Sequence, residues 1–174
     1  QPDTTRLNTL TELIFYYKDI DPAKGIETAK EALQLATLLH DEKRLASVYN
    51  YTALNYTTQG NDTTALEFFN KCLAIRKQAN DENGIAVVKH NMGISHFNLA
   101  NYPLALKYQR EAFDTFKKID NSAGMASSLN SMGIVFLYLS DYPKALDHYF
   151  QALHIYEKTG DEAKKGSAFT NIGL

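Results

Sequence analysis

The sequence predicts an all-α fold, a right-handed superhelix of about nine helices that stack one after another along the chain. The first observation is a self-similarity with a period of about 40 residues, since Gly93, Gly133 and Gly173 recur at this step and Ala53 stands one step earlier. The second is the spacing of apolar residues inside each repeat, three and four residues apart, which is typical of helices. Each repeat is therefore expected to form two helices.

The repeat divides the 174-residue chain into four units and a partial fifth. The units are residues 5–44, 45–84, 85–124 and 125–164, and the partial unit is residues 165–174. Because the units of such an array bury their apolar sides against their neighbours, we expect one solenoid domain over residues 1–174. The partial unit holds only the opening of a repeat, so we also expect the chain to be a fragment of a longer protein.

Helix starts are marked at a constant place in every repeat. Side chains suited to capping a second helix stand at Asp21, Asn61, Asn101 and Asp141, and those suited to capping the following first helix stand at Asp41, Asp81, Asn121 and Asp161. Prolines follow some of these caps, where the first turn of a helix tolerates them. The expected helices are therefore about 20 residues apart from start to start.

The repeated small residue has a packing explanation. Glycine inside a helix costs about 1 kcal/mol relative to alanine, so its recurrence implies a compensating gain. The register of Ala53, Gly93, Gly133 and Gly173 is expected to mark the point where the two helices of a unit cross closely, and not a turn. A large side chain at Gly133 should then overpack the crossing.

Composition and charge exclude several classes of protein. The 18 lysines and arginines against 20 aspartates and glutamates leave a net charge of −2, with no basic excess for a nucleic acid. The longest uninterrupted apolar run, residues 134–139, is far shorter than the roughly 20 residues of a membrane helix. We expect a soluble chain without membrane insertion, in a compartment that the sequence does not indicate.

No residue pattern points to catalysis or to a metal. Two pairs of histidines lie six residues apart, His90 with His96 and His148 with His154, a spacing that turns the rings of a pair away from each other on a helix. Cys72 stands in a register that is otherwise filled by alanine, so we expect a buried structural thiol. The sequence thus predicts a non-enzymatic protein with no cofactor and no metal.

These repeats resemble the tetratricopeptide repeats, in the extended form with units of roughly 40 residues that occurs in bacterial regulatory and sensor proteins. The resemblance rests on residues 91–93, NMG, and 131–133, SMG, and on the aromatic or histidine that follows at Tyr56, His96 and Phe136. HEAT repeats have a similar period, but the glycine and alanine registers favour the tetratricopeptide family. The resemblance implies a protein-binding solenoid whose first helices line a concave groove.

The resemblance also implies which residues face a bound peptide. They are Tyr17, Asn50, Leu54, His90, Asn91, Ile94, Phe97, Asn98, Asn130, Ile134 and Tyr138. Asn50, His90 and Asn130 share one register, and their polar groups can form hydrogen bonds with a peptide backbone. The alternative is that these residues pack against adjoining repeats.

The predicted function is a protein- or peptide-binding scaffold, the sensing or docking segment of a larger signalling or regulatory protein, with a ligand that no motif identifies. The alternative is a structural module that self-assembles through the ends of the solenoid. The partial repeat favours weak homo-oligomer formation, because its apolar stripe of Phe169, Ile172 and Leu174 is expected to be exposed unless another copy covers it.

Overall fold

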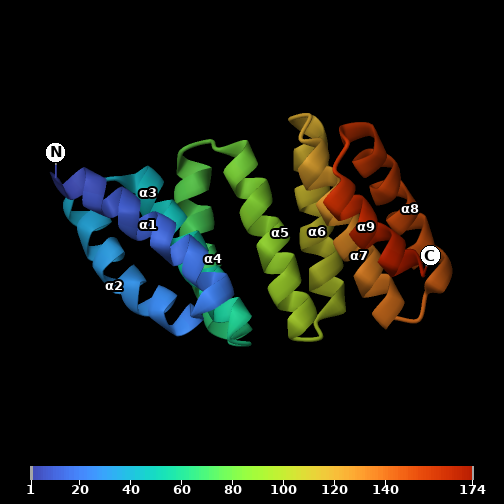
Figure 1. Ribbon diagram of the computed structural model, residues 1–174, viewed down its shortest axis with the longest axis horizontal. Coiled ribbons are helices and arrows are strands. Elements are labelled where there is room, and N and C mark those ends of the chain that lie inside the picture. Colours follow the sequence, from blue (N-terminus) through green and yellow to red (C-terminus); the bar gives the residue numbers. More distant parts are fainter. Residues whose placement is uncertain (1, 174) are drawn as a thin grey trace. The chain divides into compact units, whose positions relative to one another are not determined.

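The computed structural model describes residues 2–173, which form nine α-helices and no strand (Figure 1). The helices are α1 (Pro2–Ile20), α2 (Pro22–Leu38), α3 (Glu42–Thr58), α4 (Asp62–Gln78), α5 (Glu82–Asn98), α6 (Tyr102–Lys118), α7 (Ser122–Tyr138), α8 (Tyr142–Thr159) and α9 (Glu162–Ile172). The prediction of an all-α protein with two helices per repeat is confirmed.

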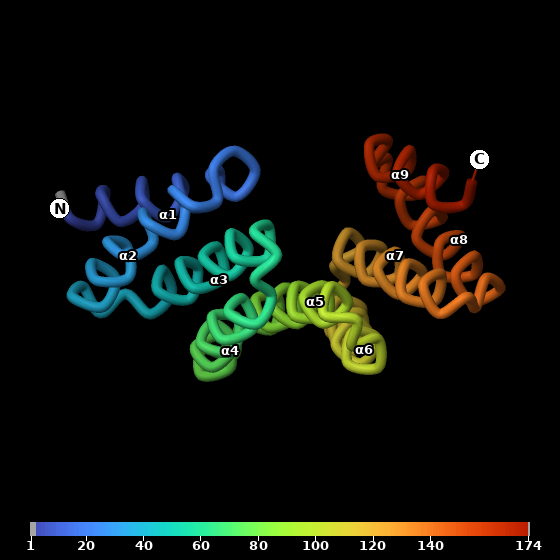
Figure 2. Tube along the Cα trace, turned by 90° about the horizontal axis from the view of Figure 1, so that it is seen from below, coloured from blue at the N-terminus to red at the C-terminus, as the bar shows by residue number. Residues whose placement is uncertain are grey.

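The chain forms two compact units, Gln1–Gly84 and Ile85–Leu174. In the N-terminal unit, α1 packs on α2 and also lies beside α3, as Figure 2 shows, and α3 packs on α4. In the C-terminal unit, α7 packs on α6 and α8, and α8 packs on α9. Each unit has its own apolar core, built around Leu7, Ile14 and Val48 in the first and around Met132 and Leu153 in the second.

All eight predicted caps are present. Each cap side chain accepts a hydrogen bond from the backbone N–H three residues later, over distances from 2.8 Å at Gly84 to 3.5 Å at Leu104. These bonds satisfy amides that have no partner within the first turn of a helix. The sequence pattern therefore predicts the helix starts correctly.

The helix ends follow an equally regular pattern that the sequence analysis missed. A residue with positive φ stands at the same place after each helix from α2 to α8, at His40, Gly60, Asn80, Ala100, Asp120, Ser140 and Gly160. Around the first of these, the N–H of Asp41 reaches the carbonyl of Ala36 at 3.0 Å and the N–H of His40 reaches that of Thr37 at 3.1 Å. This is the Schellman arrangement, which usually places glycine at the left-handed position. Most of these positions lack glycine, so composition did not reveal them.

Two of the repeated glycines lie where helices cross, as predicted. A Cβ atom on Gly93 would lie 2.6 Å from the side-chain nitrogen of Gln109 on α6, and a Cβ on Gly133 would lie 2.5 Å from the ring of Tyr149 on α8. The prediction is wrong for Gly173, which is the left-handed C-cap of α9 with φ of 87° and where an added Cβ would meet no atom within 4 Å. Among residues 2–173, no helix packs across α9 at this position.

We expect Ala100→Gly to stabilise the protein by about 0.5–1 kcal/mol, because alanine at φ of 56° is strained and glycine is not. The reverse change, Gly60→Ala, should destabilise by a similar amount, since no neighbouring atom lies within 4 Å and only the backbone conformation matters. Urea unfolding of both variants measures this. Equal midpoints for wild type and Ala100→Gly would contradict the argument.

Gly133→Ala should destabilise the C-terminal unit by about 1–3 kcal/mol, because the new methyl group would overlap the ring of the buried Tyr149. Gly166→Ala on α9 is the matched control, since no atom lies within 4 Å of its Cβ position and alanine favours a helix. In thermal unfolding, Gly133→Ala should therefore lower the melting temperature and Gly166→Ala should raise it. A neutral Gly133→Ala variant would show that the crossing has room to spare.

Candidate functional site

A groove in the C-terminal unit contains an apolar pocket between α5 and α7. The pocket has a volume of about 220 Å³ and is lined by Gly93, Ile94, Phe97, Asn98, Gln109, Ser131, Ile134 and Val135. Ile94 and Ile134 occupy equivalent positions one repeat apart, so successive first helices present the same apolar side chain to it. The pocket can accept an apolar side chain of a ligand.

Aromatic side chains stand at the α5–α7 edge of this pocket. The rings of Phe97 and Tyr138 meet edge to face with centroids 4.8 Å apart, and the centroid of Tyr102 lies 5.9 Å from that of Phe97. Tyr138 is 62% exposed, so its ring is open to a partner. Edge-to-face packing of this kind holds aromatic rings in a defined orientation.

A polar pocket adjoins the apolar one. It has a volume of about 270 Å³ and is lined by His90, Ser127, Asn130, Ser131, Tyr156, Lys164 and Ser167. Ser131 borders both pockets, which makes them parts of one groove on the first helices α5, α7 and α9. Hydroxyl, amide and ammonium groups in this pocket can bind carbonyl or carboxylate oxygens.

The polar row predicted from the sequence is already engaged inside the protein. The Nδ1 of His90 lies 2.7 Å from Oε1 of Gln109, and the Nε2 of Gln109 donates to the His90 carbonyl at 3.0 Å. Because an amide oxygen can only accept, Nδ1 of His90 carries the proton in this pair. Asn130 accepts a 2.8 Å hydrogen bond from Asn171, and Asn50 is only 8% exposed. These contacts favour the packing alternative for this row.

Gln109 was missed by the sequence analysis, although it anchors His90 from the neighbouring helix. Phe69 and Tyr149 are its equivalents in the adjacent repeats. A polar side chain in a register that is aromatic in both adjacent repeats is the sequence signal that could have revealed it, and the structure buries this side chain to 1% exposure.

The remaining predicted residues lie at separate places. Leu54 is half-buried on α3 of the N-terminal unit, and Asn91 is half-buried on α5 of the C-terminal unit. Tyr17 faces α2, where the ammonium of Lys24 lies 5.2 Å from its ring centroid. The structure thus brings His90, Ile94, Phe97, Asn98, Asn130 and Ile134 to the groove of the C-terminal unit.

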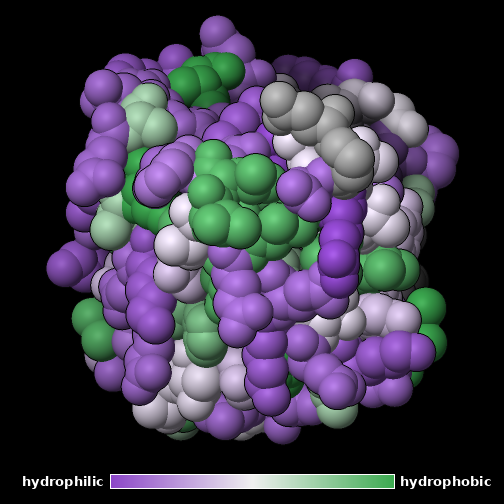
Figure 3. All heavy atoms as spheres, turned by 90° about the vertical axis from the view of Figure 1, so that its left-hand side faces the viewer, coloured by the Kyte–Doolittle hydropathy of each residue, from purple (hydrophilic) through white to green (hydrophobic). Residues whose placement is uncertain are grey.

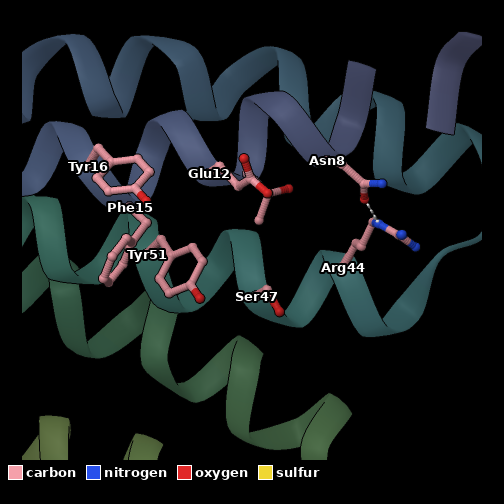
Figure 4. Close-up of a pocket in the computed structure, with 8 residues that line it drawn as sticks. Asn8, Glu12, Phe15, Tyr16, Arg44, Ser47 and Tyr51 are labelled. Carbon is pink, nitrogen blue, oxygen red and sulfur yellow. Dashed lines mark hydrogen bonds between the residues drawn. The ribbon is translucent and has the colours of Figure 1, made fainter. Parts of the chain in front are cut away.

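The N-terminal unit holds a second concave site, the α1–α3 cleft, which the sequence analysis missed (Figure 4). It has a volume of about 330 Å³ and is lined by Asn8, Thr11, Glu12, Phe15, Tyr16, Arg44, Ser47 and Tyr51. Figure 4 shows the three aromatic rings at one end, Arg44 and Asn8 at the other, and Glu12 between them.

Residues 2–173 contain no group of three or more histidine, cysteine, aspartate or glutamate side chains that could hold a metal. Cys72 is buried and unpaired, and burial raises the pKa of its thiol despite the nearby Arg76. No described helix is both long enough and apolar enough to span a bilayer.

Comparison with known proteins decides the family. The model of the tetratricopeptide repeat matches residues 14–78 and 84–158, well over half of the chain. The chain belongs to the tetratricopeptide repeat family. The predicted family and superhelical repeat class are thereby confirmed, and a tetratricopeptide array is a protein-interaction scaffold.

Solved structures with this fold come from several proteins. BtubC (BKLC) from P. vanneervenii is 27% identical, with a TM-score of 0.81 over 98% of this chain and 70% of that chain. A STAND signal transduction ATPase with a tetratricopeptide repeat sensor, from Pyrococcus horikoshii, is 17% identical, with a TM-score of 0.84 over 98% of this chain but 27% of that chain.

NprR, solved in complex with its cognate peptide NprX, is 18% identical, with a TM-score of 0.80 over 94% of this chain and 48% of that chain. The likenesses to NprR and to the ATPase show the fold alone. No curated protein matches the chain significantly.

We expect the C-terminal unit of this tetratricopeptide repeat protein to lose stability as the pH falls below about 6.5. Burial lowers the pKa of His90, and Lys164 lowers it further, although the bond to Gln109 opposes them. Between the lowered pKa and the ordinary value, the unfolded chain binds a proton that the folded chain does not, so protonation favours unfolding. His90 alone can change the free energy of unfolding by at most about 1.4 kcal/mol per pH unit.

His90→Asn introduces the residue found at the equivalent Asn50 and Asn130 and should reduce this slope. His96, whose pKa burial also lowers, should contribute to the pH dependence that remains. Urea unfolding at pH 7.5 and 5.5 measures the free energy of unfolding of both proteins, and identical pH dependence would show that folding does not shift the pKa of His90.

Proposed function

We propose that this protein is a non-enzymatic scaffold that binds a peptide segment of another protein, as the sensing or docking part of a larger regulatory protein. The observation that carries the proposal is the groove of the C-terminal unit, where an apolar pocket and a polar pocket share Ser131. This combination suits an extended peptide that inserts one apolar side chain and offers oxygen atoms to its neighbours.

The polar pocket defines the neighbouring part of the ligand. Among the described residues that line it, Lys164 is the only lysine or arginine, and its Nζ forms a long ion pair of 3.6 Å with Oδ2 of Asp161. An acidic side chain or a terminal carboxylate next to the apolar residue would therefore be the favoured ligand group. NprR has this fold and was solved with a peptide, which supports the same use of the fold here.

We expect Ile134→Glu to weaken peptide binding by about tenfold or more, because it places a carboxylate in the apolar pocket. Leu146→Glu on α8 is the matched control, since Leu146 is 40% exposed and lies outside the groove lining. Peptides are selected from a displayed library with the wild-type protein, and the best binder is titrated against both variants by fluorescence anisotropy.

Circular dichroism melting curves check that both variants fold. If folded Ile134→Glu binds the selected peptide as tightly as wild type does, the groove is not the binding site. Loss of binding only in Leu146→Glu would place the ligand on α8 instead.

The second candidate function is self-assembly through the ends of the array. Ile20 and Leu38, at the ends of α1 and α2, are 78% and 75% exposed. Figure 3 views the molecule from the side of these helices and shows a patch of apolar atoms bordered by polar ones. On α9, Phe169 and Ile172 are half-buried against the core of the C-terminal unit, and Leu174 lies outside the described residues.

If the chain self-assembles in this way, we expect the mass measured by light scattering to rise with protein concentration. Leu38→Lys should then lower the mass measured at high concentration. Leu38→Lys should leave peptide binding unchanged, because Leu38 lies outside the groove. A concentration-independent monomer mass for the wild-type chain would remove this candidate.

A further inference from the structure

We infer that the α1–α3 cleft of the N-terminal unit is a binding site for the guanidinium group of an arginine side chain carried by a peptide. This site goes beyond the proposed groove, since all of its residues belong to the other unit. Three features of the cleft carry the inference: its size, its uncompensated charge and its aromatic wall.

The size of the cleft suits one long side chain. Small-molecule sites usually begin at about 300 Å³, and the cleft has about 330 Å³. Phe15 and Tyr16 lie three and four residues after Glu12 on α1, so both are neighbours of Glu12 on one helical face. Tyr51 and Ser47 face them from α3 (Figure 4).

The uncompensated charge in the cleft is negative. Arg44 is paired with the Asp41 carboxylate, and its Nε donates a hydrogen bond to the side-chain oxygen of Asn8. The charge of Arg44 is thus balanced by Asp41, and its side chain is held in place by Asn8. Glu12 forms no ion pair or hydrogen bond with any residue that the structure describes. Glu12 is exposed to solvent, so a cationic ligand can reach its carboxylate without displacing a protein group.

The aromatic wall favours a cation as well. The Phe15 centroid lies 5.1 Å from that of Tyr51 and 5.5 Å from that of Tyr16. The ammonium of Lys18 lies 4.9 Å from the Phe15 centroid, so this ring already accepts one cation, whose charge Asp19 balances. Tyr16 is 60% exposed and leaves its ring available to another.

Arginine fits this arrangement better than lysine. A guanidinium is planar, so it can stack on a tyrosine ring while two of its N–H groups point at one carboxylate. The hydroxyl of Thr11, which donates its own hydrogen to the Leu7 carbonyl, lines the same cleft and can accept a hydrogen bond from the guanidinium, whereas Ser47 already accepts one from Arg76. An acidic peptide that sought Arg44 would instead have to displace Asp41 and Asn8.

The test uses amidated and acetylated peptides of sequence Gly-Gly-Xaa-Gly-Gly, in which Xaa is arginine, its neutral isostere citrulline, or glutamate. Each is titrated to millimolar concentration into the whole chain and followed by amide chemical shifts. The arginine peptide should shift the amides of Glu12, Phe15, Tyr16 and Tyr51, and the other two peptides should not.

Glu12→Gln removes only the charge, and Glu27→Gln, at an exposed position of α2 outside the cleft, is the matched control. Glu12→Gln should weaken binding of the arginine peptide about fivefold or more, and Glu27→Gln should leave it unchanged. Tyr16→Ala, at an exposed position, should weaken it as well.

Equal binding of the arginine and citrulline peptides, or equal effects of Glu12→Gln and Glu27→Gln, would overturn the proposal. Preferential binding of the glutamate peptide would identify Arg44 as the recognition group instead. None of these outcomes depends on Ile134, so the two sites are tested separately.

Discussion

The turn between consecutive helices is the constraint on which the arrangement depends. Helices α2 to α7 each have 17 residues, and three residues separate each from the next. Each turn combines a left-handed residue, which ends one helix, with a side chain that caps the next helix. Because both parts recur at one constant interval, equivalent residues of successive repeats occupy the same place on their helices. The groove pockets and the helix crossings both follow from that regularity.

The crossings show how one backbone plan supports different interiors. Gly93 and Gly133 leave equivalent spaces, but Gln109 fills the first and Tyr149 fills the second. The side-chain amide of Gln109 on α6 contacts His90 on α5 and holds its ring in one tautomer. The buried Tyr149 ring contributes apolar contact alone. Variation on the second helices therefore sets the chemistry of the first helices that line the groove. A ligand would meet side chains whose orientation is already fixed, which lowers the entropic cost of binding.

The first helix departs from the regular plan and thereby produces a different site. α1 has 19 residues and only Asp21 separates it from α2, without a left-handed residue between them. Consequently, the residues of α1 that face the neighbouring helices are not those at the equivalent positions of the other repeats. Ile14 is fully buried and its carbonyl accepts a 2.9 Å hydrogen bond from Asn55 on α3, while Phe15 and Tyr16 face the cleft. The two units thus contain pockets with different linings: Ile94, Ile134 and several hydroxyl groups in the C-terminal unit, and three aromatic rings with Glu12 and Arg44 in the N-terminal unit.

The sequence by itself determined the helices, their starts, the family and the recurrence of Ile94 and Ile134, which the structure places in one pocket. These features depend on hydrogen bonds between residues close in sequence and on a pattern that recurs in every repeat. They can therefore be predicted without knowing which helices are in contact. Ile94 and Ile134 were found in this way. The tertiary structure alone decided which polar groups remain available to a ligand, because hydrogen bonds such as those of His90 with Gln109 and Asn130 with Asn171 join residues on different helices. It also decided the rotation of α1, since an α1–α2 connection of one residue changes which face meets α3, and no periodic signal in the sequence records that change.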